Sequence, residues 1–148
     1  MKKYIPIPFI TFIKQSQHII KAFALLYLLF IISDPAFSQE TGQVKKVYDG
    51  DTVLLSDGRK IRYLGINTPE WQEPFYLKAK QLNESLVMGK DVRLEFDEER
   101  VDKYGRLLAY VYVGEQMVNA KLIEECLAHA FFIPPNQKHN ALLLKLQA

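Results

Sequence analysis

Beyond residue 43, short runs of alternating apolar and polar residues are separated by turn residues, which is the pattern of β-strands. This pattern predicts strands at residues 44–48, 52–55, 60–66, 91–96 and 107–113. Asp-Gly pairs at residues 49–50 and 57–58 lie between the first three runs, and Asp-Gly between apolar runs is a strong hairpin signal. The folded part of the chain therefore starts with antiparallel hairpins.

The apolar period changes from two to that of a helix after Pro74. Apolar residues then recur on one helical stripe, at Phe75, Ala79, Leu82 and Leu86, and Gly89 is a natural stop. A shorter helical repeat follows at Val118, Leu122 and Ile123, and Asn136 is a candidate cap for a third helix that runs to the chain end. Five short strands with a helix inserted after the third predict an α+β fold, and a small closed barrel leaves no sheet edge exposed.

Composition sets the class of protein. With 148 residues, 49% of them apolar and 24% charged, the chain is an ordinary globular protein with room for one domain. From Gln39 onward it holds 15 basic and 16 acidic residues, so any site for an anion must be built locally. The single cysteine, Cys126, excludes an internal disulfide and a Cys-rich zinc site, and we expect it to be a small buried hydrophobe.

The first 38 residues are typical of a secretory signal peptide. Four lysines precede an uncharged apolar run at residues 22–32, and small residues occupy the −3 and −1 positions, Ala36 and Ser38. An uncleaved membrane anchor is the alternative, but such a run spans only ~16 Å of a hydrocarbon core of ~30 Å. We therefore predict a signal peptide at residues 1–38 and one domain at residues 39–148. The product is expected to be secreted or periplasmic, with no stable membrane association.

Three polar clusters carry the candidate chemistry: Asp49-Gly50-Asp51-Thr52, Asn67-Thr68-Pro69-Glu70 and Asp102-Lys103-Tyr104-Gly105-Arg106. Taken singly, each has a structural explanation as a turn, a helix start or a solvated loop. Taken together, they offer the oxygen ligands that hard divalent cations require, from Asp51, Asn67 and Glu70. Arginine forks match phosphate oxygens two at a time, and Arg62 and Arg106 supply two of them.

These clusters, in this order, resemble the staphylococcal nuclease (thermonuclease) family. The resemblance covers roughly residues 44–136 and rests on Arg62 and on the blocks at 47–53 (VYDGDTV), 65–70 (GINTPE), 96–97 (FD), 102–106 (DKYGR), 108–112 (LAYVY) and 117–119 (MVN). It implies an oligonucleotide-binding (OB) barrel of five strands with about three helices. It also implies a monomer that uses Ca²⁺ to hydrolyse DNA and RNA and leaves 3′-phosphate and 5′-hydroxyl ends.

The resemblance assigns the metal site and the water. Asp51 is similar to the principal calcium ligand, Asn67 takes the place of a second carboxylate ligand, and Thr68 would contribute its backbone carbonyl. Glu70 resembles the residue that orients or deprotonates the attacking water, and the sequence leaves these two roles open. Because Asn67 stands where relatives have an aspartate, we expect weaker Ca²⁺ binding than at a site with two aspartates.

The resemblance also assigns contacts to the substrate. Arg62 and Arg106 resemble the pair that grips the scissile phosphate, while Lys103 and Tyr104 resemble contacts to the neighbouring phosphate. A base-stacking aromatic residue is expected close to residues 130–134, and the sequence does not distinguish between the candidates there, Phe131 and Phe132. Relatives usually continue beyond the position of Ala148, so the last helix is expected to be short and its leucines poorly covered.

A catalytically weak or silent OB module, which binds nucleic acid or a protein partner, is the alternative function. Such modules typically lose the acidic and arginine residues that are all present here, which favours an enzyme. Trp71 is interpreted as a packing residue, with DNA stacking as the alternative. His129 and His139 lack metal-ligand spacing with each other or with a carboxylate cluster, which makes a histidine-metal nuclease site improbable.

Overall fold

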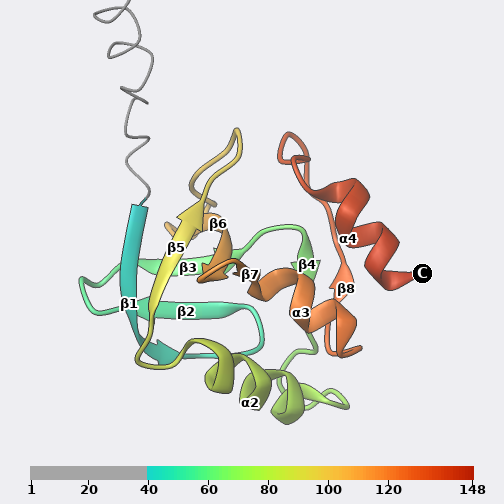
Figure 1. The fold of residues 1–148 in the computed structure, drawn as a ribbon, viewed down its shortest axis with the longest axis horizontal. Helices are drawn as coiled ribbons and strands as arrows, with labels where there is room; N and C mark the ends of the chain where they lie inside the picture. The colour runs from blue at the N-terminus through green and yellow to red at the C-terminus, as the bar shows by residue number, and fades with distance from the viewer. Residues whose placement is uncertain (1–39) are drawn as a thin grey trace, which may run out of the picture. The chain divides into compact units, whose positions relative to one another are not determined.

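The computed structural model describes residues 40–148 (Figure 1). The predicted signal peptide lies outside the described residues, so its cleavage stays a prediction. Across the part of the chain that is described, no helix combines the length and apolar character needed to cross a membrane.

Five strands form a closed barrel, as the hydrophobic pattern predicts. They are β1 (Glu40–Val47), β2 (Thr52–Leu55), β3 (Lys60–Tyr63), β5 (Asp91–Glu95) and β6 (Leu107–Val113). The short β7 (Gln116–Met117) turns back and pairs antiparallel with the end of β6. The sheet order is β3-β2-β1-β5-β6-β7, and a parallel pairing of β3 with β6 closes the barrel. This is the α+β architecture of an OB fold, and it removes the free edges that an open sheet would expose.

Strand β1 takes part in both halves of the barrel. Its first half pairs with β5 and its second half with β2, and the register shifts between Val44 and Lys46. Such a bulge bends a strand and increases its twist, which a small closed barrel requires. The inward side chains of all five strands form one apolar core with residues of the helices, and Val53, Ile61, Tyr110 and Leu122 are among its fully buried members.

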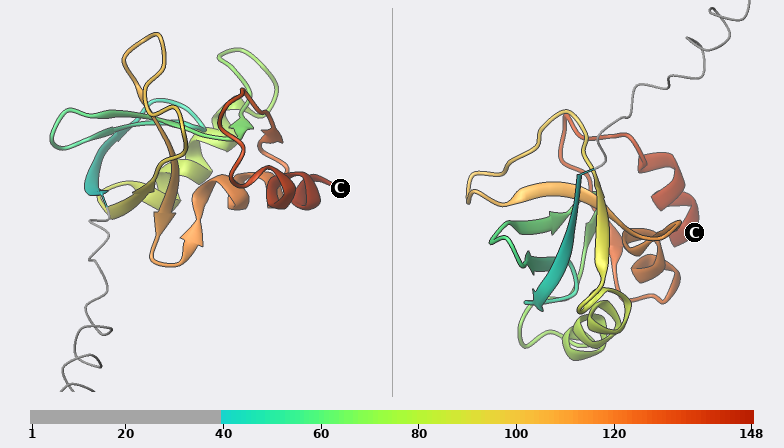
Figure 2. Two further views of the ribbon diagram at one scale, coloured as in Figure 1. Left: turned by 90° about the horizontal axis from the view of Figure 1, so that it is seen from above. Right: turned by 60° about the vertical axis from the view of Figure 1, so that its left-hand side comes forward.

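Three helices cover the barrel: α2 (Tyr76–Val87), α3 (Val118–Glu124) and α4 (Asn140–Gln147). A separate two-stranded sheet joins β4 (Ile66–Asn67) to β8 (His129–Ala130). The three views agree that α4 lies on the side of the domain away from β1, and Figure 1 shows α2 at the foot of the barrel (Figures 1 and 2). Although α4 is short, it buries Leu143 completely, while Leu142 and Leu144 remain largely exposed, so the expectation of poor cover holds for these two leucines.

The predicted strand at residues 60–66 is wrong as a single strand. Strand β3 ends at Tyr63, the chain turns at Gly65, which has a φ of 75°, and a new strand begins at Ile66. A Cβ atom on Gly65 would lie 2.5 Å from the Leu143 Cδ1 atom of α4, so the turn needs both the positive φ and the missing side chain. The turn therefore lets β4 leave the barrel and pair with β8.

The predicted start of the helix after Pro74 also needs correction. Phe75 is not part of the buried stripe: it precedes α2 with a φ of 69°, and it is 59% exposed. Asn83 is buried on α2 instead. Its polar side chain tolerates burial because it accepts a hydrogen bond from the Tyr63 hydroxyl at 2.9 Å and donates one to the Asp49 carbonyl at 3.0 Å. The polar Asn83 thereby ties α2 to the loop that carries the first acidic cluster.

Three further expectations about single residues need correction. Asn136 caps no helix: it lies before α4, where it accepts a hydrogen bond from the Glu99 amide at 2.8 Å and donates one to its carbonyl at 3.0 Å. Cys126 is exposed, because it follows α3 in a turn with a φ of 56°. Trp71 is 69% exposed and forms a T-shaped pair with Tyr76, at 5.3 Å between ring centroids, so its packing is at the surface and not in the core.

Candidate functional site

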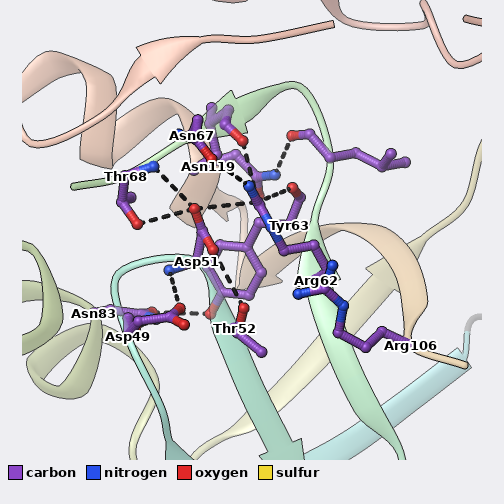
Figure 3. Close-up of polar contacts among 12 residues, drawn as sticks. Asp49, Asp51, Thr52, Arg62, Tyr63, Asn67, Thr68, Asn83, Arg106 and Asn119 are labelled. Atoms are coloured by element: carbon purple, nitrogen blue, oxygen red, sulfur yellow. Dashed lines mark hydrogen bonds and ion pairs between the residues drawn. The ribbon is translucent and has the colours of Figure 1, made fainter. Parts of the chain in front are cut away.

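Asp51 lies beneath the site and is almost fully buried (Figure 3). The β1–β2 turn brings it against Thr68, whose backbone amide and hydroxyl both donate to Asp51 Oδ2 at 2.9 Å. The Thr52 hydroxyl donates to Oδ1 at 3.2 Å, and Arg62 Nη1 lies 3.2 Å from Oδ2. The sequence places Asp51 and Thr68 in separate clusters, and the fold joins them.

Burial raises the pKa of Asp51 to about 6, against the effect of Arg62, which lowers it. The neighbouring Asp49 carboxylate, which accepts a hydrogen bond from the Asp51 amide at 3.0 Å, raises the same pKa further. A buried carboxylate beside a second one is stabilised in its charged form by nearby positive charge. The position of Asp51 is therefore electrostatically suited to a cation.

Arg62 projects from the outer face of β3, and backbone and side-chain oxygens fix its guanidinium. Nη1 donates to the carbonyls of Tyr63, at 2.7 Å, and Ile66, at 3.1 Å, while Nη2 donates to Asn67 Oδ1 at 2.8 Å. These bonds use three of the five N–H donors of an arginine, and Nε makes no hydrogen bond among the described residues. A rigid guanidinium with unused donors can bind an anion without first being ordered.

A groove of about 530 Å³ opens above this buried layer. Its walls come from β3, β4, the loop before β6 and the segment after β8. Predicted site residues line it: Arg62, Asn67, Glu70, Lys103, Tyr104, Arg106 and Phe131. The structure thus brings seven of the ten predicted site residues into one groove, with Asp51 and Thr68 buried beside it.

Arg106 is held by Asp102, which the sequence analysis places in the third polar cluster without assigning it a role. Arg106 Nε donates to Asp102 Oδ2 at 2.6 Å, and Oδ1 accepts the backbone amides of Tyr104 and Arg106 at 2.9 and 3.0 Å. Burial alone would raise the pKa of Asp102, but these hydrogen bonds outweigh it and hold the pKa below its ordinary value. The available sequence signal was the aspartate at the start of a turn, since aspartate side chains accept hydrogen bonds from the backbone two residues on.

Glu70 lies on the rim of the groove with an exposed side chain. Its backbone amide donates to Glu73 Oε2 at 2.7 Å, and its carbonyl accepts from the Glu73 amide at 2.9 Å. These bonds fix the turn after Pro69, although neither uses the Glu70 carboxylate. That carboxylate is therefore free of intramolecular partners among the described residues and faces solvent at the groove.

The structure separates the two aromatic candidates. Phe131 is 46% exposed and lines the groove, whereas Phe132 packs against the core close to Gly65. Tyr104 is 71% exposed, and the Lys103 ammonium and the Arg106 guanidinium lie 5.1 and 5.3 Å from its ring centroid. Aromatic rings with exposed faces are the surfaces on which unpaired bases stack, and Phe131 and Tyr104 have them here.

The oxygen donors suit a hard cation better than a transition metal. The Asp51 carboxylate and the Asn67 side-chain amide lie close together because Arg62 contacts both, and Thr68 contacts Asp51 through its backbone amide and hydroxyl. Within residues 40–148, no three His, Cys, Asp or Glu side chains form a group that could hold a metal ion. A cation at this position would therefore depend on amide and carbonyl oxygens, which Ca²⁺ accepts.

Comparison with known proteins points to one family. Residues 60–148 match the family model described as "Staphylococcal nuclease homologue". The chain is 38% identical to the thermonuclease of Staphylococcus intermedius over 147 residues, which covers 87% of this chain and 88% of the relative. It is 36% identical to the thermonuclease of Staphylococcus hyicus over 119 residues, or 74% and 70% of the two chains. Endonuclease YncB of Bacillus subtilis is 41% identical over 105 residues, or 64% of this chain and half of that protein.

Proposed function

The chain belongs to the staphylococcal nuclease family, and on this premise we propose that it is a calcium-dependent nuclease that cleaves both DNA and RNA and leaves 3′-phosphate ends. As a member, it is an enzyme that hydrolyses phosphodiester bonds. One observation carries the proposal: the guanidiniums of Arg62 and Arg106 and the carboxylate of Glu70 line the same groove above the buried Asp51. Two cations and a solvent-facing base are what attack of water on a phosphodiester requires.

Asp51, Asn67 and the Thr68 carbonyl are the residues that would hold Ca²⁺. When bound, the ion supplies positive charge that withdraws electrons from the phosphate oxygens. The neutral Asn67 amide leaves Asp51 as the charged ligand of this set. Because Asn67 Oδ1 already accepts a hydrogen bond from Arg62 at 2.8 Å, the ion and the arginine would share this oxygen.

Glu70 is assigned to the attacking water. A carboxylate at the groove rim can accept a hydrogen bond or a proton from a water molecule as its oxygen bonds to phosphorus and the bond to the 5′-oxygen breaks. The proton then resides on Glu70, and the leaving 5′-oxygen takes a proton from solvent. The phosphate remains on the 3′-oxygen, which gives the expected 3′-phosphate and 5′-hydroxyl ends.

Arg62 and Arg106 are assigned to the charge that grows on the phosphate oxygens in the transition state. Each is held by protein acceptors, Arg62 by backbone carbonyls and Arg106 by Asp102, with further N–H donors left over. Prepositioned donors stabilise developing charge without reorganisation during the reaction. This is why arginine, with its planar fork, suits the role better than lysine.

Lys103, Tyr104 and Phe131 are assigned to the rest of the substrate. The Lys103 ammonium can pair with a neighbouring phosphate, and the exposed rings of Tyr104 and Phe131 can stack on bases. Stacking and phosphate contacts read no base sequence, which fits an enzyme that accepts DNA and RNA alike. The enzyme is proposed to act as a monomer outside the cytoplasm, after cleavage of residues 1–38.

Digestion assays test the proposal directly. Purified protein is incubated with single-stranded DNA, duplex DNA and RNA in Ca²⁺, in Mg²⁺ or with a chelator, and product ends are identified by their need for 3′-dephosphorylation before ligation. Cleavage of DNA and RNA in Ca²⁺ alone, with 3′-phosphate ends, is expected. Glu70→Gln is the matched control, because it removes the charge and leaves the side-chain shape. Tight binding without cleavage would support the alternative of a binding module.

A further inference from the structure

Outside the groove, the barrel surface carries an aromatic ring flanked by two lysines. The ammonium nitrogens of Lys46 and Lys60 lie 4.7 and 4.3 Å from the ring centroid of Tyr48. Both lysines are exposed, and neither forms an ion pair among the described residues. Neither the sequence analysis nor the site described above assigns a functional role to any of these three residues.

The strand register places this surface directly beside Arg62. Lys46 of β1, Leu54 of β2 and Lys60 of β3 are paired in one row, so their side chains share the outer face of the barrel. The next row holds Tyr48 and Thr52, linked by a 2.9 Å backbone hydrogen bond, and then Arg62. Lys60 and Arg62 are two residues apart on one face, a separation of about 6.6 Å between Cα atoms.

Arg62 therefore lies between two cationic regions. The groove with Arg106 lies on the β6 side of β3, because β3 closes onto β6. Lys60 precedes Arg62 on β3 itself, and Lys46 lies across β2, on β1. Figure 1 shows β2 and β3 side by side, and the end of β1, at Val44–Val47, pairs with β2. A strand of nucleic acid that crosses Arg62 would leave the groove over this surface.

We propose that Lys46, Tyr48 and Lys60 form a second binding surface for the sugar–phosphate backbone of the substrate strand, beyond the scissile phosphate. This inference rests on the proposed nuclease function and extends its binding site. A phosphate backbone fits because the two ammoniums are exposed and uncompensated, on a chain whose residues 39–148 carry slightly more acidic than basic side chains. Continuity with Arg62 distinguishes it from a scattered pair of surface lysines.

The tyrosine ring gives these lysines a defined position without neutralising them. A cation beside an aromatic face is attracted by the ring quadrupole and keeps its full charge for an anion. Arg106 differs, because its partner is the carboxylate of Asp102 at 2.6 Å, which offsets part of its charge. The Tyr48 surface is therefore suited to attract phosphates along the strand, with no part in the chemistry.

Kinetics on substrates of two lengths test this inference. The test variant carries Lys46→Gln and Lys60→Gln. The matched control for lost positive charge is Lys145→Gln, because Lys145 is on α4, which lies on the far side of the domain (Figure 1). One substrate is a single-stranded DNA of about 20 nucleotides, and the other is a dinucleotide that occupies only the groove. KM and kcat are measured in Ca²⁺ over a range of salt concentrations.

For the long substrate, the double variant is expected to raise KM on the order of tenfold at low salt, with kcat unchanged. The slope of log KM against log salt concentration should fall by about 1.4, because each lysine that neutralises a phosphate of a single strand contributes about 0.7. The dinucleotide should show no change, and Lys145→Gln should behave as the unmodified protein does. The pair Lys46→Arg and Lys60→Arg keeps both charges and should retain most of the salt dependence.

An unchanged salt slope for the long substrate would overturn the inference while leaving the nuclease function intact. Equal losses on both substrates would also overturn it, because they would indicate damage to the groove. If the unmodified protein cleaved neither substrate, the proposed function would fail, and fluorescence anisotropy with the same long DNA would still test the surface. Circular dichroism checks that the double variant is folded. If it is not, the single variant Lys60→Gln takes its place, and its expected change in salt slope is about 0.7.

Discussion

Asn67→Asp is the substitution that best tests the proposed calcium site. Asn67 Oδ1 lies 2.8 Å from Arg62 Nη2, and the adjacent Thr68 amide donates to Asp51 Oδ2 at 2.9 Å. The change therefore places a second carboxylate beside Asp51 with nearly the same shape and without losing the acceptor for Arg62. Calcium affinity rises with the number of charged ligands.

We expect Ca²⁺ to bind on the order of tenfold more tightly to the Asn67→Asp protein, which corresponds to ~1.4 kcal/mol. Arg62 limits the gain, since part of the new charge is spent on pairing with its guanidinium. Without Ca²⁺, the added carboxylate repels Asp49 and Asp51, so thermal stability should depend more strongly on Ca²⁺ than in the unmodified protein. The maximal rate should change little, because Glu70 and Arg106 are untouched.

The assay is a Ca²⁺ titration of DNA cleavage, paired with melting curves at each Ca²⁺ concentration. Gln81→Glu is the matched control, because it adds the same charge on the exposed face of α2. An unchanged half-saturating Ca²⁺ concentration in Asn67→Asp would refute the reasoning and remove this position from the metal site. A shift of equal size in Gln81→Glu would attribute the effect to overall charge.

The remaining predictions concern the arginines, the pH dependence of stability and one glycine. Arg62→Lys or Arg106→Lys should lower kcat about a hundredfold to a thousandfold, which corresponds to ~3–4 kcal/mol, and should change KM little. Near-normal turnover of either variant in steady-state assays would remove that arginine from the mechanism. Although burial alone would raise it, the pKa of Glu95 is lowered to about 2 by hydrogen bonds with Lys138, Tyr112 and His139. The charged Glu95 side chain should therefore contribute its full stability above the ordinary pKa of 4.5, and this contribution should be lost as the pH falls toward 2. Melting curves of Glu95→Gln should accordingly show a smaller loss of stability between pH 4.5 and 2 than those of the unmodified protein. Gly65→Ala should lower the free energy of unfolding by roughly 2–4 kcal/mol in urea titrations, because alanine is strained at a φ of 75° and its methyl group would lie 2.5 Å from Leu143. A loss under about 1 kcal/mol would show that α4 shifts freely.

The fold was largely predictable because its strands alternate with period two and its turns are marked by Asp-Gly pairs. The predicted strands at residues 52–55 and 107–113 match β2 and β6 residue for residue. The prediction failed at Gly65, where an alternating pattern continues through a turn. Alternation reports which side chains are buried, and Leu64 and Ile66 are both buried although the strand has ended. Ile66 pairs with Ala130 of β8, a contact between distant segments that the local pattern cannot contain.

The residues of the candidate site were identifiable by type and order, but their arrangement was not. Asp51 and Thr68 are 17 positions apart in sequence and share a hydrogen bond at 2.9 Å. Phe131 and Phe132 are equivalent in the sequence, and only the pairing of β8 with β4 directs one to the groove and the other to the core. The support of Arg106 by Asp102 likewise required the geometry of the loop.

By itself, the sequence determined the barrel strands, the family and most of the residues that line the groove, because periodicity and residue type are local properties of the chain. The tertiary structure decided where strands stop, which of two neighbouring aromatics faces solvent, and that Lys46 and Lys60 meet at one tyrosine beside Arg62. Those features depend on strand register and on contacts between segments distant in sequence. Free energy is minimised over all such contacts together, so no single segment encodes them.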